Sequence, residues 1–421
     1  MKKYYFLTIS FIFLFISSSA FATTYTITYL GGLVGGPQSE ARGINNSGQV
    51  VGNFYPPGSR QRAFLYDAGT IHNLGTLPGG DYSEGAGIND SGQVVGFCEV
   101  GSEYSAFLWE VGSPLQDLGT FSWAVYSIAR GINNSGQVVG ASGTSTVTRA
   151  FLWESGSPMQ DLGTLAEENY NRAVKINNSG QVVGMANISS GNRAFLWEEG
   201  SPMQDIGTLV GGSASSAWGI NNLGHVVGYS SINNEPRAFI YEDNLMKDLN
   251  DLFINTLGMT VILRVAADIN DSGQIVGTGS FDGKNHAYLL TPIPELVSID
   301  IIPKGCPSEC PIKGGGSVEV AIHGKADFDV TNIDVASVRL EGVAPTRSSL
   351  KDKSTPVSSP VDECDCTSEG KDGFLDLCLK FDKKEILSAL DEVNVGDSFV
   401  LTLTGSLNDG TPIEGQDCIV I

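Results

Sequence analysis

A chain of 421 residues with a formal net charge of −22 is too acidic to bind nucleic acid or anionic lipid through general electrostatic attraction. Its length suits two domains, and its 52 glycines are typical of turn-dense β-structure. We therefore expect a soluble β-protein with neither a nucleic-acid partner nor membrane insertion.

The N-terminus has the pattern of a secretory signal. Lys2 and Lys3 precede an apolar run over residues 4–16, and Ala20-Phe21-Ala22 forms a small-x-small cleavage site. The apolar run is too short to span a bilayer with margin. Residues 1–22 are therefore predicted to be removed, which indicates an extracellular or cell-surface protein, with the periplasm as the alternative.

A nine-residue motif over residues 44–52 organises the chain that follows. Its copies start at Ile44, Ile88, Ile132, Ile176, Ile220 and Ile269, so the first five lie 44 residues apart and the last step is 49. A second marker, the glycine of Leu-Gly or Ile-Gly, keeps the same register at Gly31, Gly75, Gly119, Gly163 and Gly207. Two markers in one register predict a repeat architecture.

Each repeat has room for four short strands. In the first copy these cover residues 41–44, 49–54, 62–66 and 71–77. The first two are joined by Asn45-Asn46-Ser47-Gly48, which suits a type I turn ending in a left-handed glycine. Four strands in a 44-residue period predict the blade of a β-propeller.

The ends of the repeat region suggest how the ring closes. Residues 24–30 resemble a spare fourth strand, whereas the sixth repeat lacks a fourth strand after residues 286–290. The N-terminal strand is thus expected to complete the last blade, giving a closed six-bladed propeller over residues 23–295. The first strand of each repeat would be innermost. An insertion over residues 251–261 is interpreted as a loop that adjusts the closing blade, with a functional loop as the alternative.

The motifs resemble those of the HAF family of secreted bacterial repeat proteins. The resemblance rests on residues 131–140, 150–153, 161–165 and 248–252, and it covers about residues 24–295. One departure is that the family's His-Ala-Phe is mostly Arg-Ala-Phe here, with the histidine kept at His286. The resemblance implies an extracellular location, and the family has no established activity.

Residues 296–421 are predicted to form a second, β-sandwich domain. Strand-like runs cover residues 297–303, 318–322, 336–340 and 399–403, and residues 384–390 suit one short helix. Residues 300–303, 327–334 and 372–377 resemble a β-rich module at the C-terminal end of many secreted bacterial proteins. That resemblance implies an accessory or anchoring role.

The cysteines are concentrated in this second domain. We expect disulfides there rather than a zinc site, because the one-residue gap in Cys364-x-Cys366 is too tight for the usual zinc spacing. Cys98, alone in the repeat region, is expected to be free and buried. The six predicted disulfide cysteines are Cys306, Cys310, Cys364, Cys366, Cys378 and Cys418.

Acidic residues near two of these cysteines form a candidate calcium site. Asp365, Asp372 and Asp376 supply spaced carboxylates beside a glycine turn, which suits Ca²⁺. A solvated acidic loop braced by disulfides is the alternative. No other cofactor is expected.

Aromatic residues provide the strongest indication of a ligand. Tyr82, Tyr126 and Tyr170 each stand six residues before a repeat isoleucine, while Trp123 and Trp218 lie in or beside the same loops. Aromatic rings in one register on one face of a ring could stack against sugars or peptides. The alternative is that they pack between blades.

Catalytic motifs are absent from the sequence. None of the four histidines pairs with another at metal spacing, and no nucleophile elbow or phosphate-binding loop appears. The sequence therefore favours a secreted, monomeric, non-catalytic protein that binds a glycan or protein ligand. A carbohydrate-active enzyme, either a glycosidase or a lyase, and a purely structural surface protein remain the alternatives.

Overall fold

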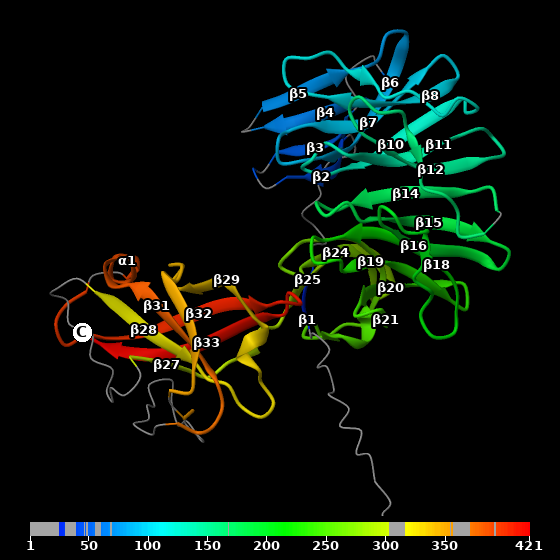
Figure 1. Ribbon diagram of the computed structural model, residues 1–421. Helices are drawn as coiled ribbons and strands as arrows, with labels where there is room; N and C mark the ends of the chain where they lie inside the picture. Colours follow the sequence, from blue (N-terminus) through cyan, green and yellow to red (C-terminus); the bar gives the residue numbers. More distant parts are fainter. Residues whose placement is uncertain are drawn as a thin grey trace, which may run out of the picture.

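The computed structural model describes residues 25–29, 39–45, 47, 49–54, 60–67, 70–166, 168–302, 316–353, 355–356, 371–390 and 393–421. The predicted signal peptide lies outside these ranges. The described chain is almost entirely β-structure (Figure 1). Within it, no helix is long and apolar enough to cross a membrane.

The first five repeats each fold into one four-stranded sheet whose strands follow chain order. This confirms the four strands predicted per repeat. The sheets are β2 (Ser39–Ile44), β3 (Val50–Phe54), β4 (Arg62–Asp67) and β5 (Thr70–Gly75); β6 (Gly80–Ile88), β7 (Val94–Val100), β8 (Glu103–Trp109) and β9 (Gln116–Asp117); β10 (Tyr126–Ile132), β11 (Val138–Gly143), β12 (Thr148–Trp153) and β13 (Gln160–Asp161); β14 (Asn171–Ile176), β15 (Val182–Ile188), β16 (Gly191–Trp197) and β17 (Gln204–Asp205); and β18 (Gly212–Ile220), β19 (Val226–Ile232), β20 (Glu235–Glu242) and β21 (Leu245–Asp248).

The sixth sheet contains the N-terminal strand. Its order is β22 (Phe253–Ile254), β1 (Tyr25–Tyr29), β25 (Lys284–Pro292), β24 (Ile275–Phe281) and β23 (Val261–Ile269). Strand β1 runs antiparallel to β25, as predicted. The insertion, which follows the 3₁₀ turn η1 (Leu249–Asp251), supplies β22, which pairs in parallel with the other edge of β1. The insertion therefore covers the outer edge of the closing strand.

The asparagine of the repeated motif explains why that motif recurs. The Oδ1 of Asn133 accepts the backbone N–H groups of Ser135 and Gln137, at 3.1 and 3.0 Å. Its Nδ2 donates to the carbonyl of Asn177 in the next repeat, at 3.0 Å. The turn closes from the N–H of Gly136, at φ +78°, to the carbonyl of Asn133. One side chain thus fixes its own turn and joins two sheets.

Valine and isoleucine from adjacent sheets pack together at five seams. Val139 of the third sheet and Ile176 of the fourth belong to one buried cluster, for example. The valines at this position in the first five sheets are fully buried: Val51, Val95, Val139, Val183 and Val227. These contacts hold successive sheets together by burying apolar surface.

The seam between the sixth and first sheets differs from the other five. Val276 is 41% exposed and Ile44 is 69% exposed, although both occupy the positions that are buried elsewhere. Asn270 donates to Gln274, and no hydrogen bond to Asn45 is found among the described residues. Pairing of β1 therefore completes the last sheet at its outer edge, while the inner-strand contact expected of a closed ring is not packed.

Residues 295–420 contain two further four-stranded sheets that share one hydrophobic core. Val320 and Leu379 from one sheet and Leu401 and Leu403 from the other are fully buried in it. The first sheet is β27 (Ile299–Ile301), β28 (Ser317–Ile322), β31 (Asp376–Asp382) and β30 (Arg347–Lys351). The second is β26 (Glu295–Leu296), β33 (Pro412–Val420), β32 (Ser398–Leu407) and β29 (Ile333–Leu340), preceded by the turn η2 (Val330–Asn332).

The one α-helix within the described ranges, α1 (Lys383–Ala389), lies within one residue of its prediction. Its N-cap is Asp382, whose side chain accepts from the backbone N–H groups of Lys384 and Glu385. A carboxylate at this position satisfies N–H groups that have no partner inside the helix.

The cysteines require one correction. Cys98 is free and buried, as expected, but Cys378 is also a free thiol, so its assignment to a disulfide is wrong. Its side chain is buried within strand β31, between β28 and β30. Cys418 is disulfide-bonded, whereas Cys306, Cys310, Cys364 and Cys366 lie outside the described residues. No disulfide joins two cysteines that are both described.

Candidate functional site

A cavity of about 630 Å³ lies where the first strands of the repeats meet. This confirms that the first strand of each repeat is innermost. Glycine and aliphatic residues form much of its wall. The charged and aromatic side chains that line it are Arg42, Glu84, Arg130, Lys175, Trp218 and Asp268. We call this cavity the channel.

Both carboxylates of the channel are engaged. Glu84 forms an ion pair with Arg42 at 3.5 Å and accepts a hydrogen bond from the Tyr82 hydroxyl at 3.0 Å. Asp268 forms an ion pair with Lys175 at 2.7 Å. The second pair links the fourth and sixth sheets across the channel.

Sequence reasoning missed most of these charged residues. They stand one, two or four positions before the repeat isoleucines, where the repeats differ from one another. Arg42, Arg130 and Trp218 occupy the same position in the first, third and fifth repeats, two residues before Ile44, Ile132 and Ile220. Aligning the repeats and noting where large polar side chains replace small ones would have found them.

Trp218 is the predicted ligand-binding residue that lines the channel. Its side chain is 37% exposed, and its indole N–H donates to the Ser216 hydroxyl at 3.1 Å. Tyr229 meets the ring edge-on, with 6.1 Å between centroids. The indole is thus held in place while one part of the ring remains accessible.

The other four predicted aromatic residues have different environments. Tyr82 and Tyr126 are half-buried, and the Tyr126 hydroxyl is 2.6 Å from the Thr148 hydroxyl oxygen. Tyr170 is 38% exposed, and Trp123 is 44% exposed and stacks on Phe121. None of these four lines the channel. A single binding surface that unites all five stays a prediction.

A ring of asparagines lines a second cavity, of about 560 Å³, at the turn end of the inner strands. This places the Asn-Ser-Gly turns on one face, as predicted. The amides here are largely committed to the bonds that join one repeat to the next. The ring is therefore better explained as a structural device than as a binding site.

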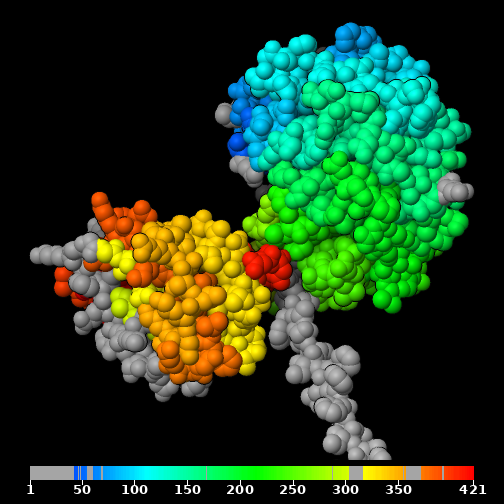
Figure 2. Space-filling view, in the orientation of Figure 1, coloured from blue at the N-terminus to red at the C-terminus, as the bar shows by residue number. Residues whose placement is uncertain are grey.

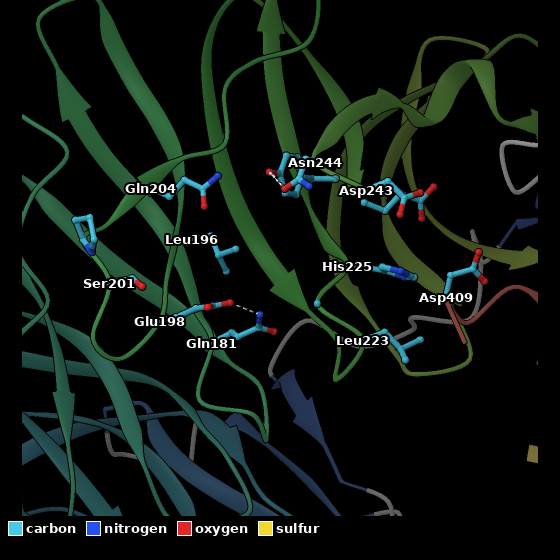
Figure 3. Close-up of a pocket in the computed structure, with 14 residues that line it drawn as sticks. Gln181, Leu196, Glu198, Ser201, Gln204, Leu223, His225, Asp243, Asn244 and Asp409 are labelled. Carbon is cyan, nitrogen blue, oxygen red and sulfur yellow. Dashed lines mark hydrogen bonds between the residues drawn. The ribbon is translucent and has the colours of Figure 1, made fainter. Parts of the chain in front are cut away.

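A third cavity, of about 410 Å³, lies between the fourth and fifth sheets and a loop of the C-terminal residues (Figure 3). Leu223 and His225 line it where other repeats have serine and glutamine, and Asp409 lines it from the loop. A Cβ added at Gly410 would overlap the Leu223 side chain. The repeat that departs from the motif is thus the one that this loop contacts. Figure 2 shows a late segment of the chain, in red, at that junction, whereas the C-terminus itself lies at the far side of the C-terminal sheets (Figure 1).

The predicted calcium site stays a prediction, because only two of its three carboxylates lie among the described residues. Asp376 is fully buried, and its carboxylate accepts the backbone N–H groups of Lys353 and Gly324, at 2.8 and 3.3 Å. Asp372 accepts from the N–H of Phe374. Asp365 lies outside the described residues, and no group of three metal-ligating side chains is found within them. Asp376 is explained by its role in bracing two loops.

Neither a family model nor a curated protein sequence matches the chain. Among solved structures, putative TolB from Agrobacterium tumefaciens has a TM-score of 0.42 and 12% identity, covering 65% of this chain and 100% of that one. The β-propeller domain of the Trilobed protease from Pyrococcus furiosus has a TM-score of 0.40 and 10% identity, covering 69% and 91%. TolB from Acinetobacter baumannii has a TM-score of 0.38 and 12% identity, covering 49% of this chain and 52%, about half, of that one. These similarities concern the β-propeller fold alone.

Proposed function

We propose that the chain is a non-catalytic binding protein that holds a sugar-containing ligand in the channel. The observation that carries the proposal is Trp218, a partly exposed indole fixed on the wall of a cavity of about 630 Å³. An aromatic face with charged groups beside it is a common arrangement for contacting sugar rings. Trp123 and Tyr170 are also accessible, but they lie outside the channel.

The state of the channel carboxylates favours binding over glycoside hydrolysis. A glycosidase needs one carboxyl group as a proton donor and a second as nucleophile or base. Glu84 and Asp268 are each paired with a cationic side chain. Neither is therefore placed as the free acid that hydrolysis requires.

The architecture proposed for this function is a six-bladed propeller followed by a β-sandwich. Six sheets in the repeat region and two sheets around one core in residues 295–420 support it. We also propose membership of the HAF family and secretion, on the basis of the repeat motifs and of residues 1–22. The C-terminal residues would serve as an accessory module.

A glycan array with residues 23–421 tests the function. Binding to a defined set of glycans, lost in Trp218→Ala and kept in Trp123→Ala, would support the channel as the site. Loss of binding in both variants would indicate that the ligand also contacts the loop that carries Trp123, outside the channel. Release of reducing sugar from a bound glycan would instead establish the enzyme alternative.

A further inference from the structure

Two arginines on neighbouring inner strands have no hydrogen-bond or ion-pair partner for their guanidinium groups among the described residues. Arg130 lies on β10 and Arg172 on β14, and both are half-buried. The Nε atoms of both are buried with no hydrogen-bond partner. Among the described residues, neither guanidinium forms an ion pair of 4 Å or less. We call these two residues the arginine pair.

The arginine pair is electrostatically uncompensated. Burial lowers the pKa of Arg130, and the positive charge of Arg172 lowers it further. Glu84 attracts Arg130, but Glu84 is already paired with Arg42 and bonded to Tyr82 and Gln61. Two like charges held close together in a partly desolvated site destabilise one another unless an anion joins them.

The charge around the channel is opposite to that of the whole protein. Three positive side chains, Arg42, Arg130 and Lys175, and two negative ones, Glu84 and Asp268, line the channel. Arg172 adds a fourth positive charge close enough to Arg130 to act on it, although the whole chain carries a net charge of −22. A positive cavity inside an acidic molecule focuses the field on anions that enter it. General surface charge does not explain this local excess.

We propose that the arginine pair binds the anionic group of an acidic sugar, a carboxylate or a sulfate, within a saccharide that contacts Trp218. Guanidinium groups present parallel N–H donors that match both oxyanions. Arg130 lines the same cavity as Trp218, and Tyr170 is near enough to Arg130 to influence it. This inference rests on the proposed glycan-binding function and specifies its ligand class.

The test is calorimetric titration of residues 23–421 with three probes: an oligogalacturonate, a sulfated galactose oligomer and a neutral galactose oligomer of equal length. We expect one acidic oligomer to bind at least tenfold more tightly than the neutral one. The oligomer that binds distinguishes carboxylate from sulfate. Arg130→Gln and Arg172→Gln should each weaken acidic binding at least tenfold and leave neutral binding unchanged.

Two controls separate binding from folding, and a third variant tests the geometry of the guanidinium group. Arg347→Gln makes the same charge change at an exposed position in β30 and should leave all binding unchanged. Without ligand, Arg172→Gln should melt at the same temperature as the parent or higher, because a like-charge contact is removed. Arg172→Lys keeps the positive charge but loses the paired N–H donors of the guanidinium group. Its affinity for the acidic oligomer should lie between those of the parent and of Arg172→Gln.

Three results would overturn the inference. Equal binding of acidic and neutral oligomers, with Trp218→Ala abolishing both, would retain the glycan-binding function and remove the anion site. Unchanged acidic binding in both glutamine variants would also remove it. No binding of any saccharide would reject the proposed function together with the inference.

Discussion

Val139 and Val276 occupy the same position in their sheets, yet the first is fully buried and the second is 41% exposed. Val139 packs with Ile176 of the following sheet, whereas Ile44, the corresponding isoleucine beyond Val276, is 69% exposed. The sequence motif is nearly identical at both seams. The comparison shows that the repeat specifies a sheet and one of its faces, while burial of that face depends on the position of the neighbouring sheet.

The comparison also separates two meanings of ring closure. Strand β1 completes the last sheet through backbone hydrogen bonds at its outer edge. Packing between the first and last sheets would need the inner-strand side chains to meet. Hydrogen bonds at one edge do not bring about apolar contact at the other, so the two can occur independently.

The largest effect is expected from placing a charge in each seam. Val139→Asp buries an unpaired carboxylate and should lower the free energy of unfolding by about 4 kcal/mol or more. Val276→Asp should cost less than about 1 kcal/mol, because that side chain is partly exposed. Denaturant unfolding of both variants measures the difference. Similar losses would show that the sixth seam is packed in solution.

A pH dependence identifies which unfolding transition belongs to the C-terminal residues. Burial raises the pKa of Asp417 from 3.8 to about 6, against hydrogen bonds from the N–H groups of Ile301 and Cys418. Between pH 4 and 6 the unfolded chain loses a proton that the folded chain keeps. Stability should therefore fall by about 3 kcal/mol as pH rises through this window and then level off.

Asp417→Asn should remove that pH dependence while leaving the repeat region unaffected. Calorimetric melts at pH 4.5, 5.5 and 7 test it. A transition that weakens with rising pH in the parent but not in the variant belongs to residues 295–421. Unchanged pH dependence in the variant would assign the effect to another group. The unfolding transition that does not belong to residues 295–421 is then the one in which Val139→Asp and Val276→Asp are compared.

The asparagine network should show the same contrast on a smaller scale. Asn133→Ala removes bonds to its own turn and to the carbonyl of Asn177, and should cost about 2 kcal/mol. Asn270→Ala removes turn bonds but no bond to the next repeat, and should cost about half as much. Denaturant midpoints compare the two. Equal costs would mean that bonds between repeats add little.

The reactivity of Cys98 measures whether the packed contact between the first and second sheets opens. Substituting this residue should disturb the structure very little. Its sulfur accepts the N–H of Leu77 at 3.4 Å, as the Ser142 and Ser230 hydroxyls accept the equivalent bonds. Burial raises the pKa of its thiol to about 11. Cys98→Ser should change stability by less than about 1 kcal/mol. In a Cys378→Ser background, reaction of Cys98 with a disulfide reagent should occur only on unfolding. Fast reaction of the folded protein would show that the contact between the first and second sheets opens without unfolding.

Particular elements show how far sequence reasoning reached at the functional site. Tyr82, Tyr126 and Tyr170 share a register, but Tyr170 is exposed, at 38%, whereas the other two are half-buried. Trp218 was found, whereas Arg130 and Arg172 were not. A shared register fixes the strand position of a side chain. Its exposure and its partners depend on the two neighbouring sheets, which a single-repeat pattern does not contain.

Local chemistry in the sequence determined the strands, the turns and the pairing of β1. The 44-residue period sets the sheets, Asn and Gly set the turns, and the missing fourth strand identifies its replacement. Only the tertiary structure decided that Val276 and Ile44 stay exposed and that Cys378 is free. It also decided that Arg130 and Arg172 lie close enough to interact while the Nε atom of each has no hydrogen-bond partner among the described residues. Strand and turn propensities act over a few residues, whereas burial and charge pairing arise between segments that the chain brings together only after it folds.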